Sequence, residues 1–279
     1  MSASRFPSRP RAFITGAAGG FGRAVALDLA ARGGRLVLGD IDAEGLSETA
    51  RLVDGKGGEA HTLVCDVRDA DQVEALAALG DDELGGIDIA VNNAGVAVAG
   101  PVGDVSLEDW KWQVDINLWG VIYGCHSVVP RMKRQRSGWI LNVASLAGIA
   151  SAPTMAPYNV TKAGVIALSE TLAGELHDTG VHVSALCPSF FRTKIHEAAR
   201  TTMPQIRDQT SKLVTGSKWS AEQIAEIALG GLERGQLYIL PQPDAKGLWR
   251  AKRLLGNRFY GVMGKVMGSR RLSKYLGND

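Results

Sequence analysis

Cysteine, histidine and long apolar runs are all scarce in this chain of 279 residues. The three cysteines, Cys65, Cys125 and Cys187, lie far apart, each within an apolar stretch. They predict small buried side chains in a reducing compartment and exclude a disulfide framework. The five histidines show no metal-ligand spacing, so we expect no metal site.

No apolar run approaches the roughly 20 residues that a membrane-spanning helix needs. The N-terminal segment MSASRFPSRPR is basic, but no apolar stretch of the signal-peptide type separates it from the first predicted strand. A net charge of +2 is too small to indicate binding to nucleic acid. These absences predict a cytoplasmic protein without a nucleic-acid partner.

The residues that are present indicate an α/β fold. The chain is 45% hydrophobic with mixed charges, which is typical of a globular domain with a substantial core. Short apolar runs such as RAFIT, RLVLGD, AHTLVCD and IDIAVNN alternate with segments of helical apolar spacing. This alternation predicts a Rossmann-like, doubly wound parallel sheet of about seven strands with helices on both faces. We expect one domain over residues 11–240, after an N-terminal arm of residues 1–10.

Residues 241–279 differ from the rest of the chain in charge. Nine Lys and Arg face only Asp244 and Asp279 there, a net charge of +7, whereas residues 1–240 carry −5. Five apolar residues of this basic C-terminal extension fall near one helical face: Leu248, Leu255, Phe259, Val262 and Val266. Three interpretations stay open: peripheral contact with an anionic membrane, docking over the pocket or on a partner subunit, and a solvated extension whose apolar residues pack on the domain.

A glycine-rich turn, TGAAGGFG (residues 15–22), joins the first predicted strand to the first helix. Gly16, Gly20 and Gly22 would let the backbone approach a pyrophosphate at the helix N-terminus. Asp40 closes the second strand, where its carboxylate could accept hydrogen bonds from an adenosine ribose. A plain turn with an ordinary acid is the alternative. Because a carboxylate repels a 2′-phosphate, and no Lys or Arg occupies the turn or positions 41 and 42, NAD(H) is favoured and NADP(H) stays an alternative.

The segment APYNVTKAG (residues 156–164) places a tyrosine and a lysine four residues apart. On a helix, Tyr158 and Lys162 would share one face, one turn from each other. An ammonium group beside a phenol favours the phenolate, so the pair is a candidate for proton transfer. Taken alone, it could equally be ordinary helix surface.

Six motifs in order resemble the short-chain dehydrogenase/reductase family over residues 11 to about 240. They are TGAAGGFG (15–22), CDV (65–67), NNAG (92–95), INLWG (116–120), VASLAG (143–148) and YNVTK (158–162). The resemblance implies an NAD-dependent oxidoreductase that transfers a hydride between nicotinamide and a secondary alcohol or ketone. An NADPH-dependent biosynthetic ketoreductase and a non-catalytic cofactor-binding regulator are the alternatives.

The resemblance also implies a role for each catalytic residue. Tyr158 would be the general acid/base, and Lys162 would lower its pKa and hold the nicotinamide ribose. Ser145 would hydrogen-bond the substrate oxygen, and Asn117 would support a water that links Lys162 to solvent. This complete set favours an enzyme over a regulator. Helices near 106–135 and 157–178 commonly form subunit interfaces in this family, which implies a homodimer or homotetramer.

The cofactor contacts that the resemblance and the glycine-rich turn imply form a longer set. It comprises Gly16, Ala18, Gly20, Phe21, Gly22, Asp40, Ile41, Asp66, Val67, Asn93, Gly95, Tyr158, Lys162, Pro188 and Thr193. Within it, Asp66, Val67 and Asn93 would contact adenosine, and Thr193 would hold the nicotinamide carboxamide.

The chain departs from the family pattern after the sixth strand, where Pro188 is followed by Ser189 and not by glycine. Because glycine permits backbone angles that serine resists, this loop is expected to take a different path. Phe190 and Phe191 follow, and they either line an apolar substrate site or pack the loop down. Residues 190–218, an apolar segment, should form the lid over the substrate. We therefore predict an apolar, steroid- or lipid-like alcohol or ketone as the substrate.

Overall fold

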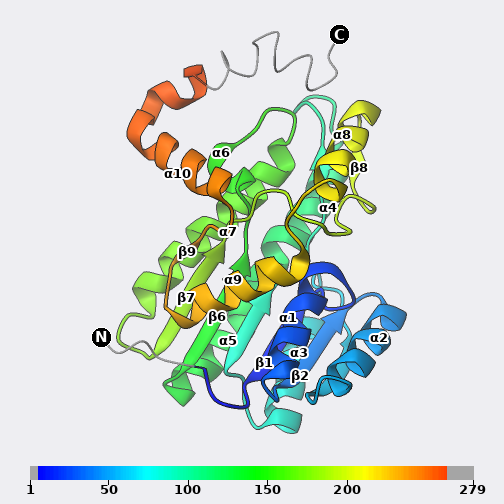
Figure 1. The fold of residues 1–279 in the computed structure, drawn as a ribbon, viewed down its shortest axis with the longest axis vertical. Coiled ribbons are helices and arrows are strands. Elements are labelled where there is room, and N and C mark those ends of the chain that lie inside the picture. The colour runs from blue at the N-terminus through cyan, green and yellow to red at the C-terminus, as the bar shows by residue number, and fades with distance from the viewer. Residues whose placement is uncertain (1–5, 263–279) are drawn as a thin grey trace.

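The computed structural model describes residues 6–262 of the protein, and its main feature is a parallel sheet covered by helices (Figure 1). Seven strands pair in the order β3-β2-β1-β4-β6-β7-β9, and every pairing is parallel. Their bounds are β1 Arg11–Thr15, β2 Arg35–Asp40, β3 Glu59–Val64, β4 Ile89–Asn92, β6 Gly138–Val143, β7 Val181–Leu186 and β9 Tyr238–Ile239. The predicted Rossmann-like sheet of about seven strands is confirmed.

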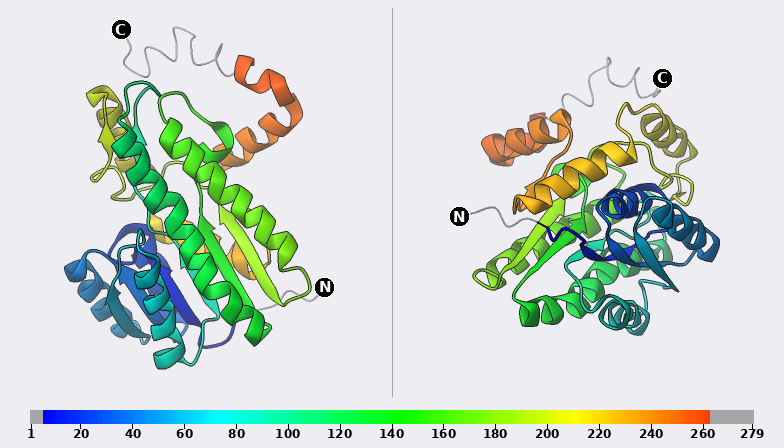
Figure 2. Two further views of the ribbon diagram at one scale, coloured as in Figure 1. Left: turned by 180° about the vertical axis from the view of Figure 1, so that it is seen from behind. Right: turned by 60° about the horizontal axis from the view of Figure 1, so that its bottom comes forward.

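Helices cover both faces of the sheet (Figure 2). The bounds of the covering helices are α1 Gly20–Ala31, α2 Ala43–Asp54, α3 Ala70–Leu84, α5 Gly120–Gln135, α7 Ala156–Glu175 and α9 Ala221–Glu233. Strand β1 shows how the two layers arise, because its side chains alternate between two apolar cores. Ala12 and Ile14 join the core under α1 and α9, whereas Phe13 joins the core under α3, α5 and α7. All three are fully buried.

The strand order reverses between β1 and β4, which creates a switch point at the carboxyl ends of these strands. Sheets of this topology bind ligands in the crevice outside that point, because the loops that leave the two strands diverge there. The glycine-rich turn after β1 and the NNAG segment after β4 both emerge at this position.

A second, small sheet lies beyond the main one and was not predicted. Strand β5 (Val98–Ala99) pairs in parallel with β8 (Arg200–Thr201). This pairing ties the lid, which also contains α8 (Pro204–Thr215), to the segment that leads into α4 (Leu107–Val114). These elements gather above the carboxyl edge of the main sheet (Figure 1).

The C-terminal extension is helical where the structure describes it, with α10 at Pro243–Leu255 followed by a 3₁₀ turn, η2, at Gly256–Arg258. Ala245 and Phe259 are buried, and the Trp249 ring lies 5.8 Å from that of Tyr238 in β9. Lys252 Nζ donates to the carbonyl of Ile149 at 2.5 Å, in α6 (Ala147–Ala150). Residues 243–262 therefore contact the domain. Val266 and the rest of 263–279 lie outside the described residues, as do residues 1–5 of the arm.

The structure also bears on the expectations about the cysteines and about membrane-spanning helices. Cys65, Cys125 and Cys187 are free and buried, which confirms the prediction of small buried side chains. Across residues 6–262, we find no helix with the length and apolarity to cross a bilayer.

Candidate active site

The glycine-rich turn after β1 is packed so closely at Gly16 and Gly22 that no side chain fits at either position. Gly16 has a φ of +68°, and a Cβ there would lie 2.6 Å from Asn93 Nδ2. A Cβ on Gly22 would collide with the carbonyl oxygen of Gly16. Gly19 precedes α1 and offers no capping side chain, so the first-turn amides stay available to an anion. This cradle fits the pyrophosphate of a dinucleotide.

Asn93 and Thr15 join the turn to the end of β4. Thr15 Oγ1 accepts from the backbone N–H groups of Asn93 and Ala94, at 3.1 and 3.3 Å. The Asn93 Nδ2 group donates to the carbonyls of Thr15 and Gly16, both at 2.9 Å. Asn93 therefore braces the glycine-rich turn of residues 15–22, which we call the phosphate turn. Its predicted contact with adenosine stays a prediction.

Asp40, at the end of β2, accepts hydrogen bonds from two backbone N–H groups. Its Oδ2 accepts from the backbone N–H of Ala18 at 2.9 Å, and its Oδ1 accepts from that of Asp42 at 3.1 Å. The next side chain, Ile41, is 71% exposed, and its predicted contact with the cofactor stays a prediction. The structure thus places a carboxylate and an uncovered apolar side chain together beside the turn.

The predicted residues after β3 are more enclosed. Val67 is buried, and a Cβ on Gly120 would lie 2.9 Å from its Cβ. The Asp66 carboxylate is paired with Arg68 at 2.5 Å, and hydrogen bonds from Arg68 lower the pKa of Asp66. Asp66 therefore stays ionised at neutral pH.

Ser145, Tyr158 and Lys162 come together at the carboxyl edge of the sheet. Ser145 follows β6, and the other two lie one turn apart on α7. Lys162 is 2% exposed, and its Nζ donates to the carbonyl of Val143 at 2.7 Å. The same Nζ lies 5.7 Å from the centre of the Tyr158 ring. We refer to residues 143–162 as the catalytic strip.

One glycine, Gly148, allows the two helices of the catalytic strip to pack closely against each other. Gly148 in α6 lies so close to α7 that a Cβ there would be 2.6 Å from the carbonyl carbon of Lys162 and 2.7 Å from its oxygen. The Ser145 hydroxyl accepts from the backbone N–H of Ala147 at 3.1 Å, which fixes the start of this short helix. Backbone contact between α6 and α7 therefore sets the position of Ser145 relative to Tyr158.

Burial dominates the acid–base properties of this strip. Burial raises the pKa of Tyr158, and a hydrogen bond with Ser145 opposes that rise. Burial also lowers the pKa of Lys162 from 10.5 to about 8. The expected lowering of the Tyr158 pKa by Lys162 stays a prediction.

Asn117 lies in a π-helical turn, η1 (Asp115–Trp119), between α4 and α5. Such turns are often found at functional sites because they displace a side chain from the regular helical path. Asn117 is fully buried, with its Oδ1 accepting from the Val96 N–H and its Nδ2 donating to the Val96 carbonyl, both at 2.8 Å. A Cβ on Gly95 would lie 3.3 Å from Asn117 Oδ1 and 3.6 Å from Lys162 Nζ. Gly95 thus lies close to both Asn117 and Lys162, where a larger residue would contact their side chains.

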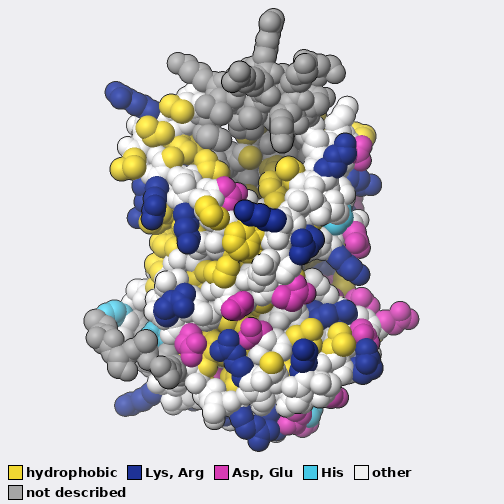
Figure 3. Space-filling view, in the orientation of Figure 1, with side chains coloured by type: hydrophobic (Ala, Val, Ile, Leu, Met, Phe, Trp, Pro, Cys, Tyr) yellow, Lys and Arg dark blue, Asp and Glu magenta, His cyan; other side chains and the backbone are white. Residues whose placement is uncertain are grey.

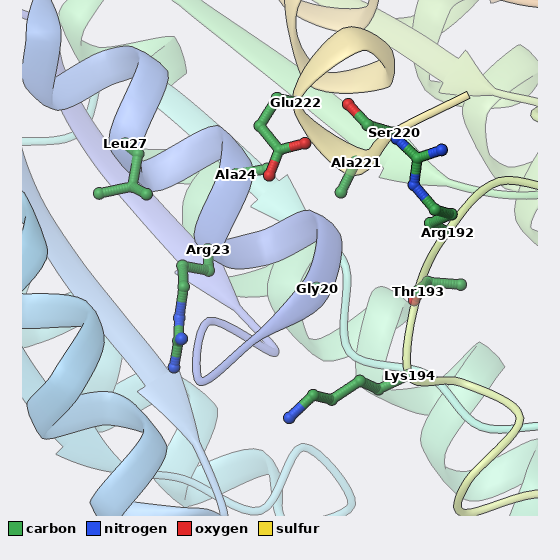
Figure 4. A pocket seen from close by; sticks show the side chains of 10 residues that line it. All are labelled: Gly20, Arg23, Ala24, Leu27, Arg192, Thr193, Lys194, Ser220, Ala221 and Glu222. Atoms are coloured by element: carbon green, nitrogen blue, oxygen red, sulfur yellow. The ribbon is translucent and has the colours of Figure 1, made fainter. Parts of the chain in front are cut away.

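The loop after β7 follows the buried Pro188 and leads to Thr193. Ser189 is not among the residues with positive φ, so serine replaces the usual glycine here without left-handed strain. Thr193 Oγ1 would lie 3.3 Å from a Cβ on Gly20, so Thr193 faces the phosphate turn. Figure 4 shows the cavity between them, of about 390 Å³. It is lined by Gly20, Arg23, Ala24, Leu27, Arg192, Thr193, Lys194, Ser220, Ala221 and Glu222.

The two aromatic residues of this loop have different surroundings. Phe191 packs on the core under α1, with its ring 6.1 Å from that of Phe21 in an edge-on arrangement. Packing is therefore the interpretation that the structure favours for Phe191. Phe190 is 43% exposed and stays a candidate for lining the substrate site. Sequence reasoning missed Gln242, whose side chain reaches this loop from a segment about fifty residues away in the chain.

The fold, the cradle and the catalytic strip define an oxidoreductase of the short-chain dehydrogenase class. A sequence model described as "short chain dehydrogenase" matches residues 10–204, and the chain belongs to this family. Relatives in this family act as reductases and dehydrogenases on CH–OH or keto groups.

Two relatives and one solved structure show how similar other proteins are to most of the chain. It is 35% identical over 220 residues to the 3-oxoacyl-(acyl-carrier-protein) reductase FabG of Thermotoga maritima, a match that covers 77% of this chain and 87% of that protein. It is 36% identical over 218 residues to 3beta-hydroxysteroid dehydrogenase 1 of Eggerthella lenta, covering 77% and 83%. A short-chain dehydrogenase/reductase from Burkholderia phymatum, crystallised in complex with NAD, superposes with a TM-score of 0.85 at 33% identity, covering 90% of this chain and 95% of the other.

Proposed function

We propose that the protein transfers a hydride between NAD(H) and a secondary alcohol or ketone. The observation that carries this proposal is the juxtaposition of Ser145, Tyr158 and the buried Lys162 beside a glycine cradle at the switch point of the sheet. When bound, the nicotinamide supplies the hydride acceptor or donor. The protein positions the substrate and moves the proton.

Tyr158 is the proposed general acid/base. Its hydroxyl, hydrogen-bonded to Ser145, passes a proton to or from the substrate oxygen, which Ser145 holds in place. Burial alone raises the Tyr158 pKa, so a nearby positive charge is needed to favour the phenolate. Lys162 supplies a charge on the same helical face, and Asn117, which lies near it beside Gly95, is the proposed support for a water that would connect it to solvent.

NAD(H) is the proposed cofactor, with NADP(H) as the alternative. The Asp40 carboxylate beside the phosphate turn supports this preference, because it would repel a 2′-phosphate. The similar Burkholderia phymatum enzyme, crystallised with NAD, supports it as well. Ile41, Asp66, Val67 and Asn93 are the proposed neighbours of the adenosine.

An apolar, steroid- or lipid-like substrate is the proposed class. The exposed Phe190 supports it, and so do relatives that are named for acyl and hydroxysteroid substrates. Apolar side chains also gather beside α10 in the upper half of the molecule, whereas the lower half, around α1 and α2, carries mixed charges (Figure 3).

We further propose a cytoplasmic homodimer or homotetramer. Trp119, 45% exposed and stacked on Tyr123, supports an interface on the helices near 106–135, and Val160, 52% exposed on α7, supports one there. Peripheral membrane contact of the extension stays a prediction that the exposed Leu254 motivates. Co-sedimentation with anionic vesicles of the full chain and of a chain ending after Pro243 tests it, and equal binding by the two would contradict it.

A panel assay tests the main proposal. Purified protein is incubated with secondary alcohols of graded size, sterols included, and with NAD and NADP in parallel. We expect turnover with NAD on bulky apolar alcohols, and a loss of about 10³-fold in kcat for Tyr158→Phe, since a positioned acid/base contributes about 10²–10⁴-fold. Unchanged turnover in Tyr158→Phe would refute the proposed mechanism. Cofactor binding without turnover on any substrate would favour a regulator.

A further inference from the structure

The structure assigns Gln242 as a positioning residue for the active-site loop, with Ser189 and Asp244 as its supporting pair. This inference deepens the proposed function and rests on it for its kinetic consequences. Its starting point is that Gln242 is 1% exposed, although it begins a surface helix.

Both polar atoms of the Gln242 side chain are used on two consecutive residues of the loop after β7. Its Oε1 accepts from the backbone N–H of Ser189 at 2.9 Å, and its Nε2 donates to the carbonyl of Phe190 at 3.4 Å. A primary amide is suited to this task because it combines one acceptor and one donor in a plane. The side chain makes no capping bond to α10, so it serves the loop and not its own helix.

Ser189 and Asp244 form a second bond between the same two segments. The Ser189 hydroxyl donates to Asp244 Oδ2 at 2.5 Å. A glycine at position 189, the usual residue in the family, could not make this bond. The departure from the family pattern therefore coincides with a contact to the C-terminal extension.

The loop that Gln242 holds lies next to predicted active-site residues at both of its ends. The Pro188 carbonyl accepts from the N–H of Leu146, the residue after Ser145, at 2.9 Å. Beyond Phe190 the loop continues to Thr193, which faces the phosphate turn. The bonds from Gln242 and Asp244 thus fix the segment between the catalytic serine and the predicted nicotinamide contact. Freeing this segment would weaken the binding of the alcohol and leave the hydroxyl and ammonium groups that move the proton in place, so the loss should fall mainly on KM.

Substitutions at Gln242, Ser189 and Asp244 test this role, beginning with Gln242→Leu and Gln242→Glu. Gln242→Leu removes both bonds of the amide, whereas Gln242→Glu keeps an acceptor for the Ser189 N–H. We expect Gln242→Leu to raise KM for the alcohol by about tenfold with kcat within about threefold, and Gln242→Glu to recover part of the loss. Lys246→Ala, on the exposed side of the same helix, is the matched control and should behave as the parent.

The bond between Ser189 and Asp244 gives a second test, which does not depend on whether the Gln242 variants fold correctly. Ser189→Ala and Asp244→Ala should each raise KM by about two- to threefold, and the double variant by no more than either alone, because they remove the same bond. Asp244→Asn keeps an oxygen acceptor and should restore the parent value. Additive effects, or an unchanged KM in both single variants, would overturn the assignment.

Amide hydrogen exchange separates this inference from the proposed function. In Gln242→Leu, exchange at residues 189–194 should accelerate at least about tenfold, while exchange in β1 and β6 stays unchanged. This readout needs no turnover, so an inactive parent protein would refute the enzymatic proposal and leave the positioning test intact. Unaltered exchange in a folded Gln242→Leu, or a lower melting temperature and kcat with an unchanged KM, would show that Gln242 is merely structural.

Discussion

The catalytic strip and the lid border the same end of the sheet but are held in place in different ways. In the strip, backbone packs against backbone, as where Gly148 contacts Lys162, and the Lys162 side chain is buried. The lid also has one backbone pairing, β5 with β8, but partly exposed side chains make its contacts with α4. Arg200 pairs with Asp109 at 2.8 Å, and its guanidinium lies 3.8 Å from the centre of the Trp112 ring.

This difference has an energetic meaning. Close-packed backbone has one arrangement, and a misfit of a few tenths of an ångström must be absorbed by moving a whole helix. An exposed ion pair contributes about 0–1 kcal/mol and can break and re-form. The strip is therefore suited to holding reacting groups in fixed positions, and the lid to admitting substrates of different shapes.

Gly148→Ala should produce the largest effect, because it attacks the packing of the strip directly. A Cβ at 2.6 Å from the Lys162 backbone must push α6 away from α7, and Ser145 with it. We expect kcat/KM to fall by about 100-fold or more, since misplacement by about 1 Å can cost this much. Steady-state kinetics on the best substrate of the panel measures it.

Gly174→Ala, on the neighbouring helix α7, is the control for this substitution. A Cβ at Gly174 would meet no atom within 4 Å, so this change should leave activity unaltered. It should raise the free energy of unfolding by up to about 1 kcal/mol through helix propensity. Full activity in Gly148→Ala would show that the strip tolerates displacement, and the comparison with the lid would fail.

The pH dependence of the free energy of unfolding tests whether the Lys162 ammonium is buried in the strip. Lys162 has a pKa of about 8 in the folded chain and 10.5 as its ordinary value. Between these values the unfolded chain binds a proton that the folded chain has released, so stability rises with pH across this window. Below pH 8 the lysine is charged in both states, and its destabilising effect is constant.

Denaturant unfolding of the cofactor-free chain at pH 7.5 and 9.5 measures this contribution. Relative to Lys162→Met, the parent should gain about 1–2 kcal/mol over that interval. The raised pKa of Tyr158 opposes the trend only above its ordinary value of 10.0, outside the interval. Parallel curves for parent and variant would mean that Lys162 is not desolvated, and that the strip is more open than its packing indicates.

The same contrast explains which features the sequence could predict. The phosphate turn, Asp40 and the Tyr158–Lys162 pair depend on local spacing and on regular elements, so short motifs indicate them. The bonds from Gln242 and the β5–β8 pairing join segments far apart in the chain, and no local pattern signals such contacts. The packing of Phe191 on Phe21 likewise joins two segments far apart in the chain, so no local pattern signals it.

The smallest effect is expected from Arg200→Leu, which releases the lid from α4. The variant loses an ion pair in which Arg200 is 44% exposed, together with its stacking on Trp112, each worth no more than about 1 kcal/mol. The hydroxyl and ammonium groups of the strip are untouched, so KM for a bulky alcohol should rise by about two- to fivefold while kcat and the melting temperature hold. Because salt screens exposed pairs, the difference between parent and variant should shrink in 1 M salt.

Lys212→Ala, on the exposed face of α8, serves as the control that leaves KM unchanged. A loss of kcat as large as that of Gly148→Ala would mean that the lid is as rigidly coupled to the chemistry as the strip, and that one mechanism of positioning governs both.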